Sequence, residues 1–298
     1  MSQQNRQGAV FARLATGRWH FQHGPIDLVL DVDAAARVRE RCIAACWQAF
    51  QDILSGLAAE LPALRRPASE RRPLRGPVAQ RMAMACAPYA DEVFITPMAA
   101  VAGAVADELI GVFHQAGVKR ASINNGGDIA LHLAPGASYN VGVWSRIDAS
   151  DGLDGGFVVN AAMPVRGVAT SGWRGRSFSL GVADSVTVLA QTAAAADAAA
   201  TLIANAVNCE GACIIRAPAS TLKDDSDLGD RLVTVEVPAL DPASKASALA
   251  RGRRQAEAWR DRGLIHAAAL FLQGSVEIVE PAAAACLERG GFVAAAIA

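Results

Sequence analysis

The sequence lacks several features that mark common classes of protein. Its two most apolar windows, residues 95–113 and 186–207, are interrupted by Asp107 and Glu108 and by Asp197. Neither therefore reaches the roughly 18 uninterrupted apolar residues of a membrane span. Lys and Arg number 28 against 29 Asp and Glu, and aromatic residues make up only 5% of the chain. Without a basic field or aromatic–basic interleaving, we expect neither a membrane nor a nucleic acid as partner.

Several catalytic signatures are also missing. The chain has no P-loop, no Rossmann glycine fingerprint and no Gly-x-Ser-x-Gly elbow. Its five histidines show neither triad spacing nor metal-ligand spacing, and we interpret each as a structural or surface residue. They are His20, His23, His114, His132 and His266.

Cysteine usage and the N-terminus indicate the compartment. Six cysteines in 298 residues make no disulfide framework, and no Cys-x-x-Cys occurs. The i,i+4 pairs Cys42/Cys46 and Cys209/Cys213 have no nearby histidine to complete a zinc site. Residues 1–7 contain no apolar stretch of a signal peptide. We expect reduced, buried cysteines in a cytoplasmic protein.

Short apolar runs alternate irregularly with a few long helical patterns. Strands are predicted at 9–14, 26–32, 122–133, 140–143, 157–161, 166–170, 177–182, 185–190, 232–237 and within 265–279. Helices are predicted at 34–57, 97–115, 194–207 and 242–262. This arrangement favours an α+β fold over regular βαβ alternation. We expect residues 1–298 to form a single domain, and two interpenetrating α/β subdomains remain an alternative.

Three polar segments combine glycines, hydroxyls and carboxylates. Gly167–Gly172 reads Gly-Val-Ala-Thr-Ser-Gly, a loop whose backbone could approach a phosphate. Asp197 and Thr201 lie four residues apart in an alanine-rich run, so a helix would carry both on one face. Asn124–Asp128 is a polar glycine turn. A hard divalent cation holding a pyrophosphate would use such oxygen ligands.

Each segment also has a purely structural interpretation. An Asn-Gly turn supplies positive φ angles, and hydroxyls commonly stabilise loops. Asp197 would stabilise the dipole at the start of a helix, while Thr201 would bond to a backbone carbonyl. The residues alone leave both interpretations open.

Taken in order, the segments resemble those of the ApbE flavin transferases (FAD:protein FMN transferases), and more closely their UPF0280 relatives. The family's Asn-x-Gly-Gly-Asp turn, Ala-Thr-Ser-Gly loop and Ala-Asp-Ala-x-Ala-Thr helix start match residues 124–128, 169–172 and 196–201. The resemblance covers roughly residues 90–210. It implies an ApbE-like fold with mixed or antiparallel sheets and packed helices.

The resemblance also implies a ligand set. Mg²⁺ would be held by Asp197, Thr201 and the carbonyl of Ala169, beside the pyrophosphate of FAD. FAD would be the ligand or the substrate, and its FMN half would pass to a protein acceptor. A homodimer is left open. The residues expected to bind FAD are Asn125, Gly126, Gly127, Asp128, Thr170, Ser171, Gly172 and Arg174.

One segment departs from the family pattern. Flavin transferases carry a His-x-x-Asp-Pro segment whose histidine assists catalysis, but residues 173–184 contain neither His nor Pro. No catalytic residue is therefore assigned. One alternative is a flavin or nucleotide carrier or sensor without transferase activity. Another is an enzyme of sulfur or amino-acid metabolism on the same scaffold, in which Cys86 or the Cys209/Cys213 pair would act.

The chain has one basic segment, within residues 65–81. It carries six arginines among prolines and reads either as a solvated loop or as an arginine-lined mouth for an anionic ligand.

Overall fold

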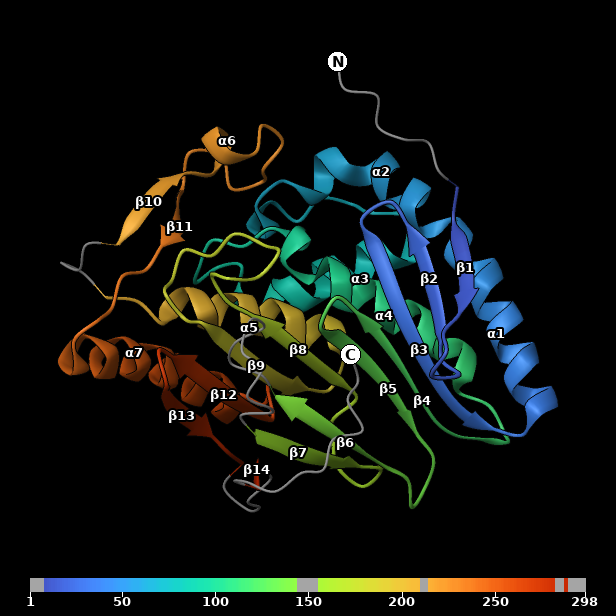
Figure 1. Cartoon of the computed structure of the whole chain (residues 1–298). Helices are drawn as coiled ribbons and strands as arrows, with labels where there is room; N and C mark the ends of the chain where they lie inside the picture. The colour runs from blue at the N-terminus through green and yellow to red at the C-terminus, as the bar shows by residue number, and fades with distance from the viewer. Residues whose placement is uncertain (1–7, 144–154, 210–213, 282–286, 289–298) are drawn as a thin grey trace.

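The largest element of the fold is a nine-stranded sheet in the order β1-β2-β3-β4-β5-β8-β9-β12-β13 (Figure 1). The structure is a computed structural model that describes residues 8–143, 155–209, 214–281 and 287–288. Every neighbouring pair in this sheet is antiparallel. The strands are β1 Val10–Arg13, β2 Trp19–His23, β3 Ile26–Ala34, β4 Val118–Asn125, β5 Asp128–Leu133, β8 Gly167–Ser171, β9 Ser185–Ala190, β12 Ala267–Leu272 and β13 Ser275–Val279.

Helices cover one face of this sheet, and two further strands cover part of the other (Figure 1). The main helices are α1 Ala36–Gln51, α2 Ile53–Leu64, α3 Pro77–Cys86, α4 Val101–Ile110, α5 Ala193–Ala206 and α7 Pro242–Asp261. Short 3₁₀ turns occupy Ala68–Glu70, Ala87–Tyr89, Pro97–Ala100 and Gly111–Phe113. The second sheet comprises β6 Ser138–Val143, β7 Gly155–Asn160 and β14 Leu287–Glu288. The predicted α+β class with antiparallel sheets is confirmed.

A small arm projects beside the helical layer. It consists of β10 Ile215–Pro218, α6 Ala219–Leu222 and β11 Leu232–Glu236, with β10 and β11 paired as a two-stranded sheet (Figure 1). The arm contacts the main body through the hydroxyl of Thr96, which donates to Asp227. The guanidinium of Arg231 also lies 3.5 Å from the ring centroid of Phe94.

Alternation along the strands creates two cores. In β3, Ile26, Leu28, Leu30 and Val32 are buried toward the helices, whereas the residues between them lie on the other face. The helix-side core extends from β2 to α7. The opposite core joins apolar side chains of β5, β8, β9 and β12 to those of β6 and β7.

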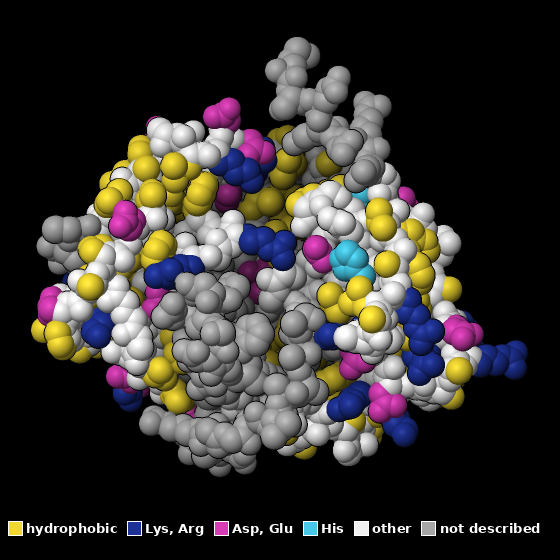
Figure 2. Space-filling view, viewed as in Figure 1, with side chains coloured by type: hydrophobic (Ala, Val, Ile, Leu, Met, Phe, Trp, Pro, Cys, Tyr) yellow, Lys and Arg dark blue, Asp and Glu magenta, His cyan; other side chains and the backbone are white. Residues whose placement is uncertain are grey.

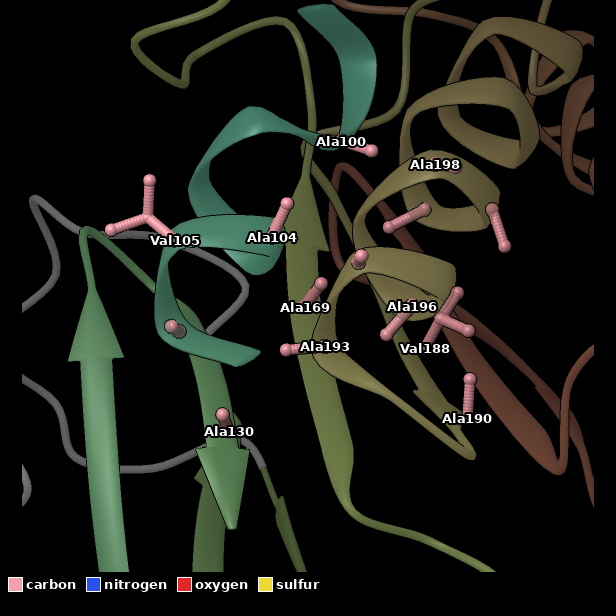
Figure 3. Close-up of a cluster of buried hydrophobic side chains, with 14 of the residues drawn as sticks. Ala100, Ala104, Val105, Ala130, Ala169, Val188, Ala190, Ala193, Ala196 and Ala198 are labelled. Atoms are coloured by element: carbon pink, nitrogen blue, oxygen red, sulfur yellow. The ribbon is translucent and has the colours of Figure 1, made fainter. Parts of the chain in front are cut away.

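Helices α4 and α5 lie unusually close because small residues meet between them. Figure 3 shows Ala104 of α4 and Ala193 of α5 close to Ala169 of β8. A Cβ atom placed on Gly103 would lie 2.3 Å from the carbonyl oxygen of Ala193. Only glycine therefore allows this approach of the two backbones.

Several local predictions are wrong. Residues 177–182 form a loop rather than a strand, because the side chain of Asn205 accepts the Leu180 amide at 2.8 Å and bonds Ser179. Strands β2 and β10 and helix α3 were not anticipated, and the strand predicted over 122–133 is the hairpin of β4 and β5. The long helix predicted over 34–57 is divided at Asp52 into α1 and α2. Ends of the remaining elements shift by a few residues, as boundaries commonly do.

The cysteine prediction is confirmed where the structure describes it. Cys42, Cys46, Cys86 and Cys209 are free and buried, while Cys213 and Cys286 lie outside the described residues. Among the helices of the described part, none is both long and apolar enough to cross a membrane.

Candidate functional site

A cavity of about 2090 Å³ opens where the β4–β5 turn, the end of β8 and helix α5 meet. The face seen in Figure 2 is hollowed near its centre, with Lys, Arg and acidic side chains around the hollow. All predicted site residues except Ala169 line the cavity: Asn125, Gly126, Gly127, Asp128, Thr170, Ser171, Gly172, Arg174, Asp197 and Thr201. Their proximity is a property of the structure, and their role in binding stays a prediction.

The β4–β5 hairpin supplies the first wall. Its two turn residues, Gly126 and Gly127, have φ angles of 66° and 114°, which a residue with a side chain rarely adopts. The side chain of Asn124 stabilises the turn by accepting the Gly127 amide at 2.8 Å. Asn125 and Asp128 face each other across the hairpin. The turn therefore holds both side chains on the helix-covered face of the sheet.

Strand β8 supplies the second wall, since it pairs with β5 through Ile129 and Ala130. This pairing lets the Thr170 amide donate to Oδ1 of Asp128 at 3.3 Å. The Thr170 hydroxyl bonds that of Thr187 on β9 at 2.8 Å. The segment predicted as a loop at 167–172 is thus strand β8, which ends at Ser171. A Cβ atom on Gly172 would lie 2.2 Å from the carbonyl oxygen of Asp184, so the chain requires glycine there.

Helix α5 supplies Asp197 and Thr201. The helix begins at Ala193, so Asp197 lies in its second turn rather than at its start. The structural interpretation of Asp197 as a group at the helix start is therefore wrong: Asp107 of α4 accepts the Ala193 and Ala194 amides at 2.9 and 2.7 Å. Oδ2 of Asp197 instead accepts the Gly103 amide at 3.0 Å.

The two carboxyl groups in the cavity, Asp128 and Asp197, are electrostatically strained. Burial raises the pKa of Asp128 to about 7, against the opposing effects of the Thr170 amide and Arg176. Burial, followed by the nearby Asp128, raises the pKa of Asp197 well above its usual range. Both groups lose solvation and repel each other when ionised. A bound cation would relieve both costs.

The donor set fits a hard cation. The carboxylates of Asp128 and Asp197 and the hydroxyl of Thr201 offer oxygen atoms only, as Mg²⁺ prefers. The Thr201 hydroxyl makes no hydrogen bond within the described residues. In the part of the chain that the structure describes, no three His, Cys, Asp or Glu side chains cluster as a metal site. Water and phosphate oxygens would therefore have to complete the coordination.

Ala169 differs from the other predicted residues. It is fully buried in β8, where it pairs with Val188 of β9, and it does not line the cavity. Its side chain packs beneath α5 (Figure 3). The ligand predicted at this position is its backbone carbonyl, which lies next to Thr170 in the strand.

Arg174 and Arg176 follow the loop on the rim of the cavity. Nε of Arg174 lies 3.4 Å from Oδ1 of Asp184, and its guanidinium lies 4.6 Å from the ring centroid of Trp173. Arg176 has no carboxylate partner within the described residues, and its guanidinium lies against Gly126. The guanidinium of Arg176 is therefore more available to an anionic ligand than that of Arg174. Nothing in the sequence around Arg176, apart from its charge, predicts this difference.

An apolar wall of the cavity was missed entirely. It is built by α2 and by the β2–β3 turn, far from the three motifs, and includes His23, Ile26, Leu54, Leu57 and Leu61. Spacing along α2 predicts a buried helical face but gives no sign that this face borders a cavity.

The basic segment contributes little to the cavity. Arg65 lines it, where its guanidinium pairs with Asp225 of the arm at 2.7 Å. Arg71 and Arg72 pair on the surface with Asp91 and Glu70, each at 2.8 Å. These pairs favour the interpretation of a solvated loop over that of an arginine-lined mouth.

Comparison with known proteins identifies close sequence relatives for part of the chain. The chain is 40% identical over 134 residues to a UPF0280 protein of Methanothermobacter thermautotrophicus, covering 45% of this chain and 50% of that protein. It is 40% identical over 137 residues to a UPF0280 protein of Methanosphaerula palustris, covering 45% and 55%. The matched part thus spans about half the length of these curated relatives.

Solved structures show a more distant similarity. The apo flavinyl transferase ApbE of Pseudomonas stutzeri is 13% identical, with 93% of this chain and 96% of that chain covered and a TM-score of 0.47. The ApbE protein of Thermotoga maritima is 13% identical, with coverage of 90% and 96% and a TM-score of 0.39. A family model described as "AbpE bacteria" matches residues 11–278. Because that match spans most of the sequence, the chain belongs to the bacterial AbpE family, within the ApbE superfamily that its motifs predicted.

Proposed function

We propose that the chain binds FAD together with Mg²⁺ and transfers its FMN half to a hydroxyl group of a protein acceptor. The observation that supports this most is the convergence of Asp128 and Asp197 with residues 170–172 on one cavity. Membership of the family is the second support. The Gly126–Gly127 turn borders the same space, so a pyrophosphate there would be within reach of all three segments.

Asp197, Thr201 and the Ala169 carbonyl would hold the ion, with Asp128 facing it. When bound, Mg²⁺ would supply positive charge that screens the pyrophosphate oxygens. The amides and hydroxyls of the loop, together with Arg176 and Arg174, would bind the phosphate oxygens. Arg176 would make the main contact with the phosphates, because the guanidinium of Arg174 is already paired with Asp184.

In the proposed transfer, the acceptor hydroxyl oxygen forms a bond to the phosphorus of the FMN half. The bond between that phosphorus and the bridging oxygen breaks, so AMP leaves with the electron pair. The hydroxyl proton must pass to a base. The residues of this chain contribute binding and alignment, which can account for a large part of such a rate acceleration.

A second candidate is a flavin-binding protein without transferase activity. It is favoured by the segment where the family has its histidine, because Asp184 is already occupied there. Its carboxylate accepts hydrogen bonds from Trp173 Nε1 at 3.3 Å and from the backbone amide of Gln273. This carboxylate is therefore not free to replace the missing histidine.

The third candidate, a thiol-dependent enzyme, has less support. Cys86 is fully buried, and burial raises the pKa of its thiol far above its usual range. A thiol held neutral in this way is a poor nucleophile. The Cys209/Cys213 pair lies partly outside the described residues. Cytoplasmic location and self-association likewise stay predictions.

Calorimetric titration of FAD tests the proposed site. With Mg²⁺ we expect micromolar binding, about −8 kcal/mol, and loss of that binding in EDTA. Asp197→Ala should abolish the metal-dependent part, whereas Asp241→Ala, at the exposed N-cap of α7, should leave it unchanged. Equal affinity in Asp197→Ala would contradict the metal assignment.

Release of AMP distinguishes the first two candidates. A transferase would release AMP from bound FAD in the presence of a hydroxyl acceptor, while a carrier or sensor would return FAD intact. Chromatographic separation of FAD, FMN and AMP after incubation with Mg²⁺ measures this directly.

A further inference from the structure

His23 is placed differently from the other histidines. Of the five, all of which lie within the described residues, only His23 lines the cavity. It is the last residue of β2, where the chain turns through Gly24 and Pro25 into β3. No sequence pattern separates it from the other histidines, because β2 itself was not anticipated.

Strand register sets its distance from the predicted phosphate site. His23 pairs with Ile26 across β2 and β3, and Leu28 pairs with Asn125 across β3 and β4. Adjacent strands lie about 4.8 Å apart, and the step from Ile26 to Leu28 adds about 7 Å along the strand, so the backbone of His23 is about 12 Å from the end of β4. Residues directly opposite in an antiparallel sheet share a face. His23 therefore lies on the same helix-covered face as Asn125 and Asp128.

The imidazole of His23 is held by packing and has no protein partner. Its ring centroid lies 6.3 Å from that of Phe50, in an edge-on arrangement. Its Nδ1 atom is enclosed and has no hydrogen-bond partner within the described residues. Buried polar atoms of this kind are uncommon in folded proteins and need an explanation. Because Nδ1 is enclosed by protein and His23 lines the cavity, a molecule bound at this end would reach the ring at Nε2.

The other groups that could take a proton in the cavity are engaged or unsuited. Asp184 is occupied by Trp173 and Arg174. Asp225 is paired with Arg65 at 2.7 Å and lies 3.8 Å from Lys223. Asp128 and Asp197 are assigned to the cation. Asp224 remains, but it is exposed on the arm, where water solvates its carboxylate.

The volume of the cavity leaves room for a second reactant. Pockets for single small ligands measure roughly 300–1,000 Å³, whereas this cavity measures about 2090 Å³. The wall around His23 is apolar and includes Ile26, Leu54 and Leu57. An acceptor segment with apolar side chains beside its hydroxyl would fit this wall, with the hydroxyl directed to the imidazole.

We propose that His23 accepts the proton of the acceptor hydroxyl in the flavin transfer. The inference rests on the proposed function, because it assigns the base that this function requires. As the acceptor oxygen bonds to phosphorus and AMP departs with the electron pair of the broken bond, the proton moves to Nε2, the ring nitrogen that is not enclosed. His23 thus does the work of the family histidine from another part of the chain.

The test compares two histidines of one strand. His23→Gln removes the base, and His20→Gln is the matched control, since His20 lies on the opposite face of β2 and pairs with Asp27 at 2.9 Å. Each variant is assayed with FAD and Mg²⁺, with water and a threonine-containing peptide as the hydroxyl probes. We expect His23→Gln to release AMP about 100-fold or more slowly, with unchanged FAD affinity, and His20→Gln to match the wild type.

Two further measurements separate a base from a structural residue. Added imidazole should restore AMP release in His23→Ala but not in Asp197→Ala. In side-chain NMR spectra, the His23 ring signals should shift when FAD and Mg²⁺ are added, whereas those of His20 should not. This second readout requires no turnover.

The outcomes are distinguishable. Wild-type rates in His23→Gln, or a loss that only follows weaker FAD binding, would overturn the assignment of His23 alone. A wild type that binds FAD but never releases AMP would overturn the transfer and the base together, leaving FAD binding intact. A wild type that fails to bind FAD would overturn the proposed function itself.

Discussion

The two ends of the helix-side core are built from opposite kinds of side chain. Near β1–β3 and α1, the rings of Phe11, Phe21, Trp47 and Phe50 pack with centroids 5.2–5.8 Å apart. Near α4, α5 and β8, the core consists largely of alanine and glycine (Figure 3). We call these the aromatic end and the alanine end. The candidate cation site lies at the alanine end.

The difference between the aromatic end and the alanine end explains how this fold positions polar groups. Large rings bury much apolar area and hold the elements apart, which stabilises the fold but keeps backbones distant. Small residues bury less area but allow backbone amides to meet carboxylates directly. At the alanine end, Gly103 donates to Asp197, and Ala193 and Ala194 donate to Asp107. Stability and positioning are therefore supplied by different regions.

The largest expected effect is at the aromatic end. Phe21 is fully buried, and Phe21→Ala should lower the free energy of unfolding by about 3–5 kcal/mol. FAD affinity should be unchanged at temperatures where the variant is folded, because the cation site lies elsewhere. Urea denaturation and calorimetry measure the two quantities. Phe11→Ala, at a position 46% exposed, should cost much less, and an equal cost would contradict the contrast.

A smaller loss of stability with a larger loss of binding is expected at the alanine end. Gly103→Ala forces the α4 and α5 backbones apart, and overpacking of this kind costs about 1–3 kcal/mol. It should also weaken Mg²⁺-dependent FAD binding, because the Gly103 amide would no longer orient Asp197.

Gly111→Ala is the matched control for this prediction. It lies at the end of the same helix, and nothing lies within 4 Å of an added Cβ. Because alanine favours helical backbone, this variant should be neutral or more stable by up to about 1 kcal/mol. Unchanged FAD binding in Gly103→Ala would show that the close approach of the helices is not needed for the site.

The smallest expected effect lies away from both ends and depends on pH. His132, on the strand that begins at Asp128, stacks with His114 at 5.1 Å. Burial lowers the pKa of both rings, with Arg166 adding repulsion. Their folded-state pKa values therefore lie below the usual value of about 6.5. Below that pH the unfolded chain binds more protons, so stability present above it is lost as the pH falls through the folded pKa values.

Chemical denaturation between pH 7.5 and pH 5 tests this contribution. The free energy of unfolding should fall toward acid pH in the wild type and fall less steeply in His132→Gln. An equal slope in the two proteins would mean that these rings do not govern the pH dependence.

The parts of the site that sequence could predict are the local ones. Gly126 and Gly127, the Ser171–Gly172 loop and the Asp197–Thr201 spacing each show their chemistry within a few residues. The class of the fold followed similarly from strand and helix patterns. The ends of the elements and the loop at 177–182 could not be predicted in this way. Residues 177–182 alternate as in a strand, but the side chain of Asn205 accepts hydrogen bonds from Leu180 and Ser179 and holds the segment as a loop.

The features of the site that could not be predicted from sequence depend on contacts between segments far apart in the chain. Asp107 caps α5 from α4, a pairing across 86 residues that no local pattern encodes. The position of His23 in the cavity depends on the register of β2, β3 and β4. The position of Arg176 depends on its contact with Gly126 in the β4–β5 turn. Such residues become visible only when the sheet order is known.

The pairing of β5 with β8 has a consequence for local unfolding. Seven residue pairs join β3 to β4, but only Ile129↔Val168 and Ala130↔Gly167 join β5 to β8. With so short a ladder, amide hydrogens along this line should exchange with solvent before those of β3 and β4. The sheet would then open into an N-terminal and a C-terminal cooperative unit, with the 124–128 turn on one and the 169–172 loop on the other. A ligand bound by both segments would hold β5 and β8 together and slow the exchange of these amide hydrogens.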